Sequence, residues 1–273
     1  MPHLVPHTGP QRVVAASNFV YTVGSGLYLT AGVLFFTQAV HLPASQVGLG
    51  LGIVAGLLSL AVGIAVSHLA DRRGARGVYA ATLVVQTLAT PGFVLVDGFW
   101  PFVLTVGAAT GAKAAGLAAR SPLIRRYGGD RPQEFRAYLR AVTNVGISLG
   151  ALLAGWAVQV GTLTAYQMLV VGNAIAFAAS AAILAFLPPV TAGPVVHGPR
   201  WIALRDRPYL LLTALEGIMA VQFKVLTVAV PLWLVEATTA PRWLVSGTMV
   251  VNTHRAVPGR VRPGRRAGRG RRA

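Results

Sequence analysis

Three ionisable side chains stand inside long apolar stretches of this sequence, where a charge is expensive to bury. They are Lys113, Glu216 and Lys224. Within a membrane, each charge costs about 2.5–3.5 kcal/mol near the bilayer centre unless it meets water or a partner. A carboxylate in such a position can exchange a proton, and a lysine on another helix can pair with it. These residues are therefore the first candidates for function.

A second set of polar residues, Asn18, Tyr21 and Tyr28, lies on the first apolar stretch, and its spacing fits one face of a helix. Other chemistry is poorly represented. The sequence has no cysteine, its six histidines show no ligand spacing, and its seven Asp and Glu residues form no cluster. We expect no metal and no cofactor, and an intramembrane enzyme is the least favoured class.

The elements that must position these residues are transmembrane helices. Hydrophobic residues make up 54% of the 273 residues and charged residues 11%, against about 25% charged in a soluble domain. A helix needs about 20 apolar residues to cross a bilayer, and the continuous apolar runs exclude the alternation of an outer-membrane barrel. The predicted fold is an all-α, polytopic transmembrane helix bundle. Its predicted spans are 13–40, 47–70, 78–96, 99–119, 141–160, 165–187 and 209–235.

Positive charges orient the predicted bundle. Thirteen Arg residues fall on alternate connections, and the opposite connections carry Arg242 alone. By the positive-inside rule, the N-terminus and the basic connections are cytoplasmic. We expect a multi-pass plasma membrane protein with a six-helix bundle over 1–187, a cytoplasmic linker over 188–208 and the start of a second bundle over 209–253.

The connection between the second and third predicted spans carries a motif. It resembles the signature loop of the major facilitator superfamily at four positions: Asp71, Arg72, Gly74 and Arg76. Ser67 and Ala75 depart from the family pattern, which usually has Gly and a basic residue there. The resemblance implies a cytoplasmic gate, in which the Asp caps a helix N-terminus and pairs with Arg, and a Gly allows a tight turn. The alternative is an ordinary basic loop.

The resemblance implies a secondary active transporter of a small solute, of a kind that includes proton-coupled drug or metabolite efflux. Its partners would be the lipid bilayer, the solute and, where coupled, protons, with no specific nucleic acid. Six spans before a long linker match the first half of a family member, which is a pair of inverted three-helix repeats. In that family the first, fourth and seventh helices line the central cavity; here they carry Asn18, Tyr21, Lys113, Glu216 and Lys224.

Lys113 and Glu216 are predicted to lie at a similar depth. Each is about seven residues, or ~10 Å, from the cytoplasmic end of its span. A contact between them would hold a closed state, or Glu216 would exchange the coupling proton. The alternative is a Lys113 side chain that extends to the cytoplasmic surface and a Glu216 that burial keeps neutral.

The fifth predicted span carries glycines at spacings typical of close helix contacts: Gly146, Gly150 and Gly155. They resemble the Gly-rich fifth-helix motif of the family's drug/proton antiporters, although that motif has Pro at the position of Ala151. The same spacing serves any tightly packed helix pair. We favour packing alone.

The transporter pattern stops after the seventh predicted span. The apolar stretch 243–252 is about half the length of a span. Residues 254–273 contain eight Arg, four Gly, three Ala and two Pro, a composition typical of GC-rich DNA read in a wrong frame. We expect a transporter truncated or frameshifted after about seven and a half helices, with a disordered tail. The alternative is a non-transporting membrane fragment whose basic tail binds anionic lipid or RNA.

Overall fold

The computed structural model of the chain describes residues 8–129, 131–188, 206–241 and 243–255. Within these ranges every regular element is a helix, which confirms the predicted fold class. The linker positions 189–205 and the Arg-rich tail beyond 255 lie outside the described residues.

The α-helices are α1 Gly9–Leu34, α2 Ala44–Leu49, α3 Ala55–Arg73, α4 Ala75–Ala89, α5 Phe99–Tyr127, α6 Pro132–Val160, α7 Leu163–Leu184, α8 Arg207–Lys224, α9 Val230–Glu236 and α10 Leu244–Arg255. The shorter turns are the π-helical η1 Phe35–Ala39, η2 Gly50–Val54 and η5 Val225–Ala229, and the 3-10 helix η3 Thr90–Leu95.

Six helical segments are long and apolar enough to cross a membrane, and each coincides with one of the first six predicted spans. They are Gly9–Ala39, Ala44–Ser67, Ala75–Leu95, Phe99–Tyr127, Pro132–Val160 and Leu163–Leu184. Their outer faces carry large apolar side chains: Leu57 is 65% exposed, Leu88 73% and Trp156 69%. A soluble monomer rarely leaves so much apolar surface in water, whereas lipid solvates it well.

The fourth and fifth spans are longer than predicted. α5 continues to Tyr127 and α6 begins at Pro132, so most of the Arg-rich connection 120–140 is helical. Arginine is a good helix former, and apolar length alone does not mark a helix end that projects beyond the apolar layer. The turn itself is made at Gly129, which has a positive φ of 58°, and Pro132 suits the first turn of the next helix.

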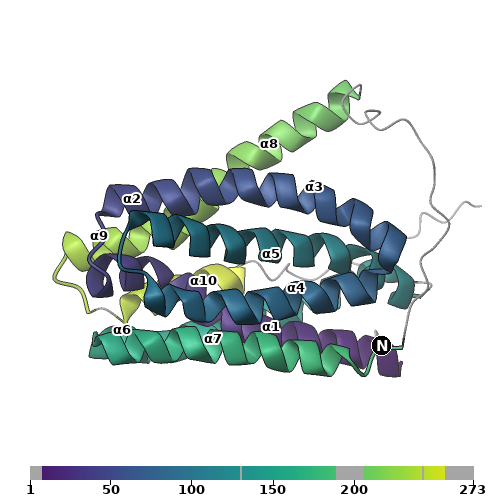
Figure 1. Cartoon of the computed structure of the whole chain (residues 1–273), viewed down its shortest axis with the longest axis horizontal. Helices are drawn as coiled ribbons and strands as arrows, with labels where there is room; N and C mark the ends of the chain where they lie inside the picture. Colours follow the sequence, from purple (N-terminus) through teal and green to yellow (C-terminus); the bar gives the residue numbers. More distant parts are fainter. Residues whose placement is uncertain (1–7, 130, 189–205, 242, 256–273) are drawn as a thin grey trace, which may run out of the picture.

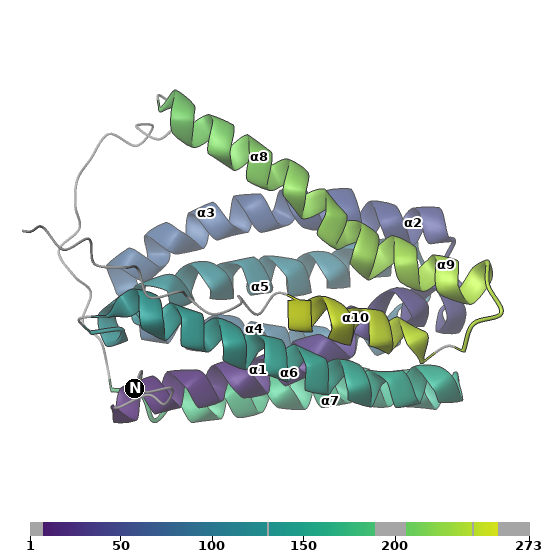
Figure 2. The same ribbon diagram turned by 180° about the vertical axis from the view of Figure 1, so that it is seen from behind.

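The first three spans, which contain α1, α3 and α4, form one triple of helices, and the next three, α5, α6 and α7, form another. The two triples interlock. α1, in the first triple, packs on α6 and α7, and α5, in the second triple, packs on α3 and α4. α4 and α7 join the two sets. Each triple therefore sends its first helix between the second and third helices of the other, an arrangement visible from both sides (Figures 1 and 2). α1 is the most enclosed span, with 72% of its apolar core buried.

Glycines allow α1 and α6 to approach closely. A Cβ added at Gly150 would lie 2.9 Å from the Cα of Gly26 on α1, and one at Gly146 would lie 3.0 Å from the carbonyl oxygen of Phe19. Gly155 instead faces α10, where its added Cβ would meet the side chain of Ser246. The three glycines of the fifth span thus lie against two different neighbours.

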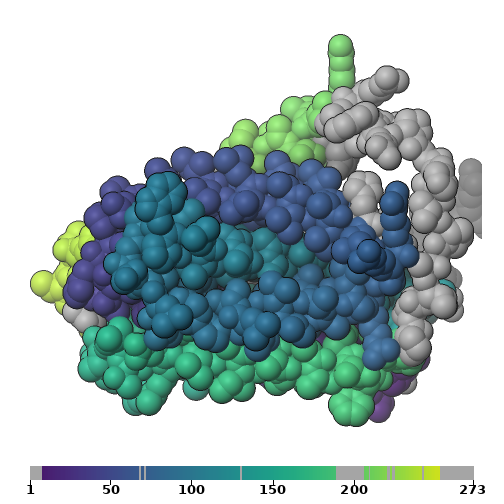
Figure 3. All heavy atoms as spheres, viewed as in Figure 1, coloured from purple at the N-terminus to yellow at the C-terminus, as the bar shows by residue number. Residues whose placement is uncertain are grey.

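The seventh apolar stretch is helical but interrupted. α8 is followed by the π-turn η5 and by α9, which has Pro231 in its first turn. Pro231 has no N–H to donate to the carbonyl of Thr227, so α-helical bonding is broken there. α8 diverges from the bundle beyond α3, whereas α10 lies back beside α6 (Figure 2). In the space-filling view α3, α4, α5 and α7 form one continuous face and α8 stands behind its edge (Figure 3).

Candidate functional site

The signature-loop residues make a turn of one residue between two helices. α3 ends at Arg73 and α4 begins at Ala75, so Gly74 alone connects them, with φ 90° and ψ 125°. This backbone conformation favours glycine because a Cβ would clash. Arg72 is exposed, and the side chain of Asp71 lies outside the described parts.

Arg76 ties this turn to the end of α7. Its guanidinium donates to the carbonyl oxygen of Ala185 at 2.8 Å. Carbonyls at a helix C-terminus lack intrahelical donors, so a cation there is stabilising. Nearby, the side chain of Gln11 donates to the carbonyl of Tyr127 at 2.8 Å, and the Tyr127 hydroxyl donates to that of Pro188 at 3.1 Å. These contacts place the start of α1 and the ends of α5 and α7 at one end of the bundle, which we call the basic end.

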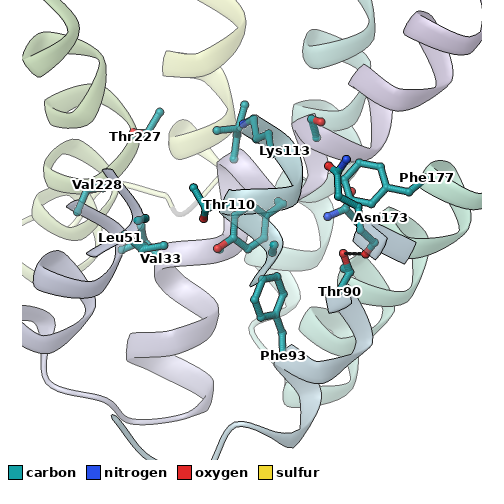
Figure 4. Close-up of a pocket in the computed structure, with 17 residues that line it drawn as sticks. Val33, Leu51, Thr90, Phe93, Thr110, Lys113, Asn173, Phe177, Thr227 and Val228 are labelled. Carbon is teal, nitrogen blue, oxygen red and sulfur yellow. Dashed lines mark hydrogen bonds between the residues drawn. The ribbon is translucent and has the colours of Figure 1, made fainter. Parts of the chain in front are cut away.

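A cavity of about 160 Å³ lies among the helices, away from this end. Its walls come from α1, the start of α3, α4, α5 and α7, together with the turns η2, η3 and η5. Thr227 and Val228 of η5 lie on one side and Asn173 and Phe177 of α7 on the other, with Thr110 between them (Figure 4). Irregular helical turns thus contribute residues at a site that regular helices would not bring together, as π-turns often do at functional sites.

Lys113 of α5 lines this cavity and is partly buried. Among the described lining residues it is the one with a formal charge. The other polar side chains that line the cavity include Ser25, Gln86 and Thr90, and the Thr90 hydroxyl donates to the carbonyl of Gln86 at 2.7 Å. Asn173 is 3% exposed, and its side-chain oxygen has no hydrogen-bond partner among the described residues.

Aromatic rings form the apolar part of the cavity wall. The rings of Tyr28 and Phe93 stack with centroids 5.2 Å apart. Phe93 also packs edge-on against Phe36, at 5.5 Å between centroids, and Phe36 is fully buried. Phe177 stacks on Tyr21 at 5.1 Å. These contacts fix the rings, so the cavity has a rigid apolar side opposite a few polar groups.

Two separate sets of hydrogen bonds lie between this cavity and the basic end. Gln86 lines the cavity and accepts a hydrogen bond from the hydroxyl of Tyr21 at 3.2 Å. Three residues further from the cavity on α1, Asn18 accepts a hydrogen bond from Arg120 and donates to Thr143 at 2.9 Å. Asn18 and Tyr21 are both buried, and the three hydrogen bonds link α1 to α4, α5 and α6.

Sequence reasoning missed Arg120 because it was counted among the basic residues of a connection. The structure instead places it within α5, seven residues and about 10 Å from Lys113 along the axis. A spacing of seven residues returns to nearly the same helix face. The sequence gives no clear signal for this placement, because Pro122, two residues beyond Arg120, would be expected to end or kink a helix, yet it lies inside α5.

The structure does not bring Lys113 and Glu216 together. Glu216 is exposed on α8, and the described residues contain no ion pair between it and Lys113. Equal depth in a membrane sets height along the axis, but not the lateral position of a helix, and α8 diverges from the bundle (Figure 1). The side chain of Lys224, at the end of α8, lies outside the described parts.

The sequence matches a known protein family. The sequence profile of the Major Facilitator Superfamily matches residues 14–252, which is most of the chain. No curated protein and no solved structure gives a significant match. The family consists of transporters rather than enzymes, and six membrane-length helices agree with it. The chain therefore belongs to the Major Facilitator Superfamily and is a multi-pass integral membrane protein.

Proposed function

We propose that this protein is a secondary active transporter component in which the cavity around Lys113 binds a small solute. The observation that supports this most strongly is the position of the cavity, where the first, fourth and seventh apolar segments meet around one partly buried cation. In transporters built from inverted repeats, substrate sites lie near the bilayer midplane at the repeat interface. The rigid aromatic wall and the few polar groups are typical of such pockets.

We further propose that the basic end faces the cytoplasm of a plasma membrane. Arg12, Arg76, Arg125 and Arg126 all belong to helix ends at this side of the bundle. Positive residues near span ends favour the cytoplasmic side. The proposal extends to the signature loop as a gate, because Arg76 couples its turn to the end of α7. Glu216 is the candidate for proton coupling, since it is an acid on a segment whose π-turn lines the cavity.

The absence of cysteine allows a direct test of the solute pathway. In this background each substituted cysteine is the single thiol of the chain. We expect Thr110→Cys, in the cavity wall, to react with a small hydrophilic methanethiosulfonate in membranes, because a solute pathway must admit water. Leu104→Cys is the matched control, since Leu104 lies on the same helix and is 72% exposed on the outer face, where lipid excludes the reagent.

Equal protection of both thiols would contradict the proposal, because the cavity would then be a dry packing defect. Faster labelling at Leu104→Cys than at Thr110→Cys would also contradict it. The result does not depend on knowing the solute.

A further inference from the structure

We propose that the cavity around Lys113 selects a small organic carboxylate that has a ring-sized apolar body and a hydrogen-bond donor. This inference rests on the proposed solute site and adds the chemical class of its ligand. Three features carry it: the charge of the cavity, an unpartnered acceptor in its wall, and its size.

The charge of the cavity favours an anion over a cation. Lys113 supplies a positive charge, and no acid occurs among the described lining residues. Charges interact more strongly in a site shielded from water than in bulk solvent. A cationic solute would meet repulsion from Lys113, and none of the described lining residues offers it a carboxylate. A carboxylate gains a charge-assisted hydrogen bond, which is stronger than a neutral one.

The cavity wall contains a hydrogen-bond acceptor without a donor among the described residues. The side-chain oxygen of Asn173 is buried and has no partner among the described residues. A buried acceptor without a partner is costly, so a ligand that donates to it gains affinity. Asn173 and Lys113 both line the cavity, from α7 and α5. A ligand with an acidic group and a hydroxyl or N–H group would therefore engage both.

The size and shape of the cavity limit the rest of the ligand. A volume of about 160 Å³ is that of a single ring with small substituents; an engineered cavity of about 150 Å³ binds benzene. The stacked rings of Tyr28 and Phe93 and the side chain of Phe177 present flat apolar surfaces. Drug-sized solutes usually require pockets of about 300 Å³ or more, so this cavity suits a smaller ligand.

Equilibrium binding to the purified 273-residue chain tests the inference. The probe is 4-hydroxybenzoate, compared with the neutral 4-hydroxybenzamide and the cationic 4-hydroxybenzylamine. We expect the carboxylate to bind at least about tenfold more tightly than either, since the net gain of a charged hydrogen bond is of that order. Benzoate, which lacks the hydroxyl donor, should bind more weakly than 4-hydroxybenzoate.

Amino-acid substitutions test which residues produce the preference for the carboxylate. Lys113→Met keeps the length of the side chain without its charge, and it should bind the carboxylate and the amide equally weakly. Lys113→Arg should keep the preference. Asn173→Ala should remove the advantage of 4-hydroxybenzoate over benzoate. Arg125→Gln is the matched control on the same helix, and it should bind as the unaltered chain does. This control matters because a net charge of +17 favours non-specific anion binding anywhere on the chain.

Equal affinity of the unaltered chain for the amide or the amine would overturn the inference, and this comparison needs no variant to fold. A preference that survives Lys113→Met would also overturn it, by assigning anion binding to other basic groups. Failure of all the probes to bind, with Thr110→Cys still labelled by the hydrophilic reagent, would reject the carboxylate class and leave the solute pathway standing. Protection of Thr110→Cys would reject the pathway itself.

Discussion

Arg120 and Asn18 show how a charge is held within the helices of this protein. The guanidinium donates to the amide oxygen of Asn18, whose nitrogen is itself fixed by Thr143 at 2.9 Å. Asn18 is 1% exposed, so water does not substitute for these contacts. The pair therefore links α1 to α5, and the contact with Thr143 links α1 to α6 on the side of the cavity nearer the basic end.

We predict that Asn18→Leu destabilises the protein by about 1.5–3 kcal/mol, because it removes a buried amide oxygen that accepts from a charged donor. Thermal unfolding in detergent measures this as a lower midpoint. The double variant Asn18→Leu with Arg120→Leu should regain part of the loss, since replacing both partners removes the unpaired group. Equal stability of the single variant and the unaltered protein would show that the contact contributes nothing.

At the scale of elements, close backbone approach decides how the first and fifth spans pack. Gly150 and Gly26 bring α6 and α1 together at a distance that admits no side chain. In a membrane, helix association depends on such packing because lipid removes the hydrophobic drive between helices. Glycines elsewhere in the spans have open space around them, as Gly56 of α3 does.

We therefore predict opposite effects for two Gly→Ala substitutions. Gly150→Ala should destabilise the protein by about 1–3 kcal/mol, because the new Cβ would force α1 and α6 apart. Gly56→Ala should be neutral or stabilising by up to about 1 kcal/mol, because alanine favours a helix and meets no neighbour. Unfolding midpoints compare them. A stabilising Gly150→Ala would refute the close contact.

The positions of the membrane-spanning helices could be predicted from the sequence better than the contacts between their side chains. The length of an apolar run locates a span, so the first six predicted spans coincide with membrane-length helices. Apolar length does not reveal where a helix ends beyond the apolar layer, which is why Arg120 was assigned to a connection. Depth along a span does not reveal lateral position, which is why the expected contact between Lys113 and Glu216 does not occur. The cavity turns η2 and η5 depend on local backbone bonding that periodicity does not report.

At the scale of the whole molecule, the two triples of helices share one pattern of contacts, and their basic ends coincide. α1 and α5 are the first helices of the triples, and both border the cavity. A site between two such repeats can be exposed on either side by rocking of the helices around it. In the proposed orientation, the basic end is the cytoplasmic side.

Reporter fusions test this orientation. We predict a cytoplasmic signal for fusions near Arg73 and an external signal for fusions near Ala44 and Ala237, because the helices alternate in direction between these points. An enzyme reporter active on one side of the membrane provides the readout at each position. A cytoplasmic signal at Ala44 would reverse the topology.

The central claim is that a solute binds in the cavity around Lys113, and protection of a cavity thiol tests it most directly. The labelling rate of Thr110→Cys is measured with and without 4-hydroxybenzoate, with Arg126→Cys at the exposed end of α5 as the control thiol. At a concentration of about four times Kd, simple occupancy predicts about fivefold slower labelling of Thr110→Cys. Labelling of Arg126→Cys should not change, and the protection should vanish when Lys113→Met is added. An unchanged labelling rate at Thr110→Cys under saturating carboxylate would contradict the account.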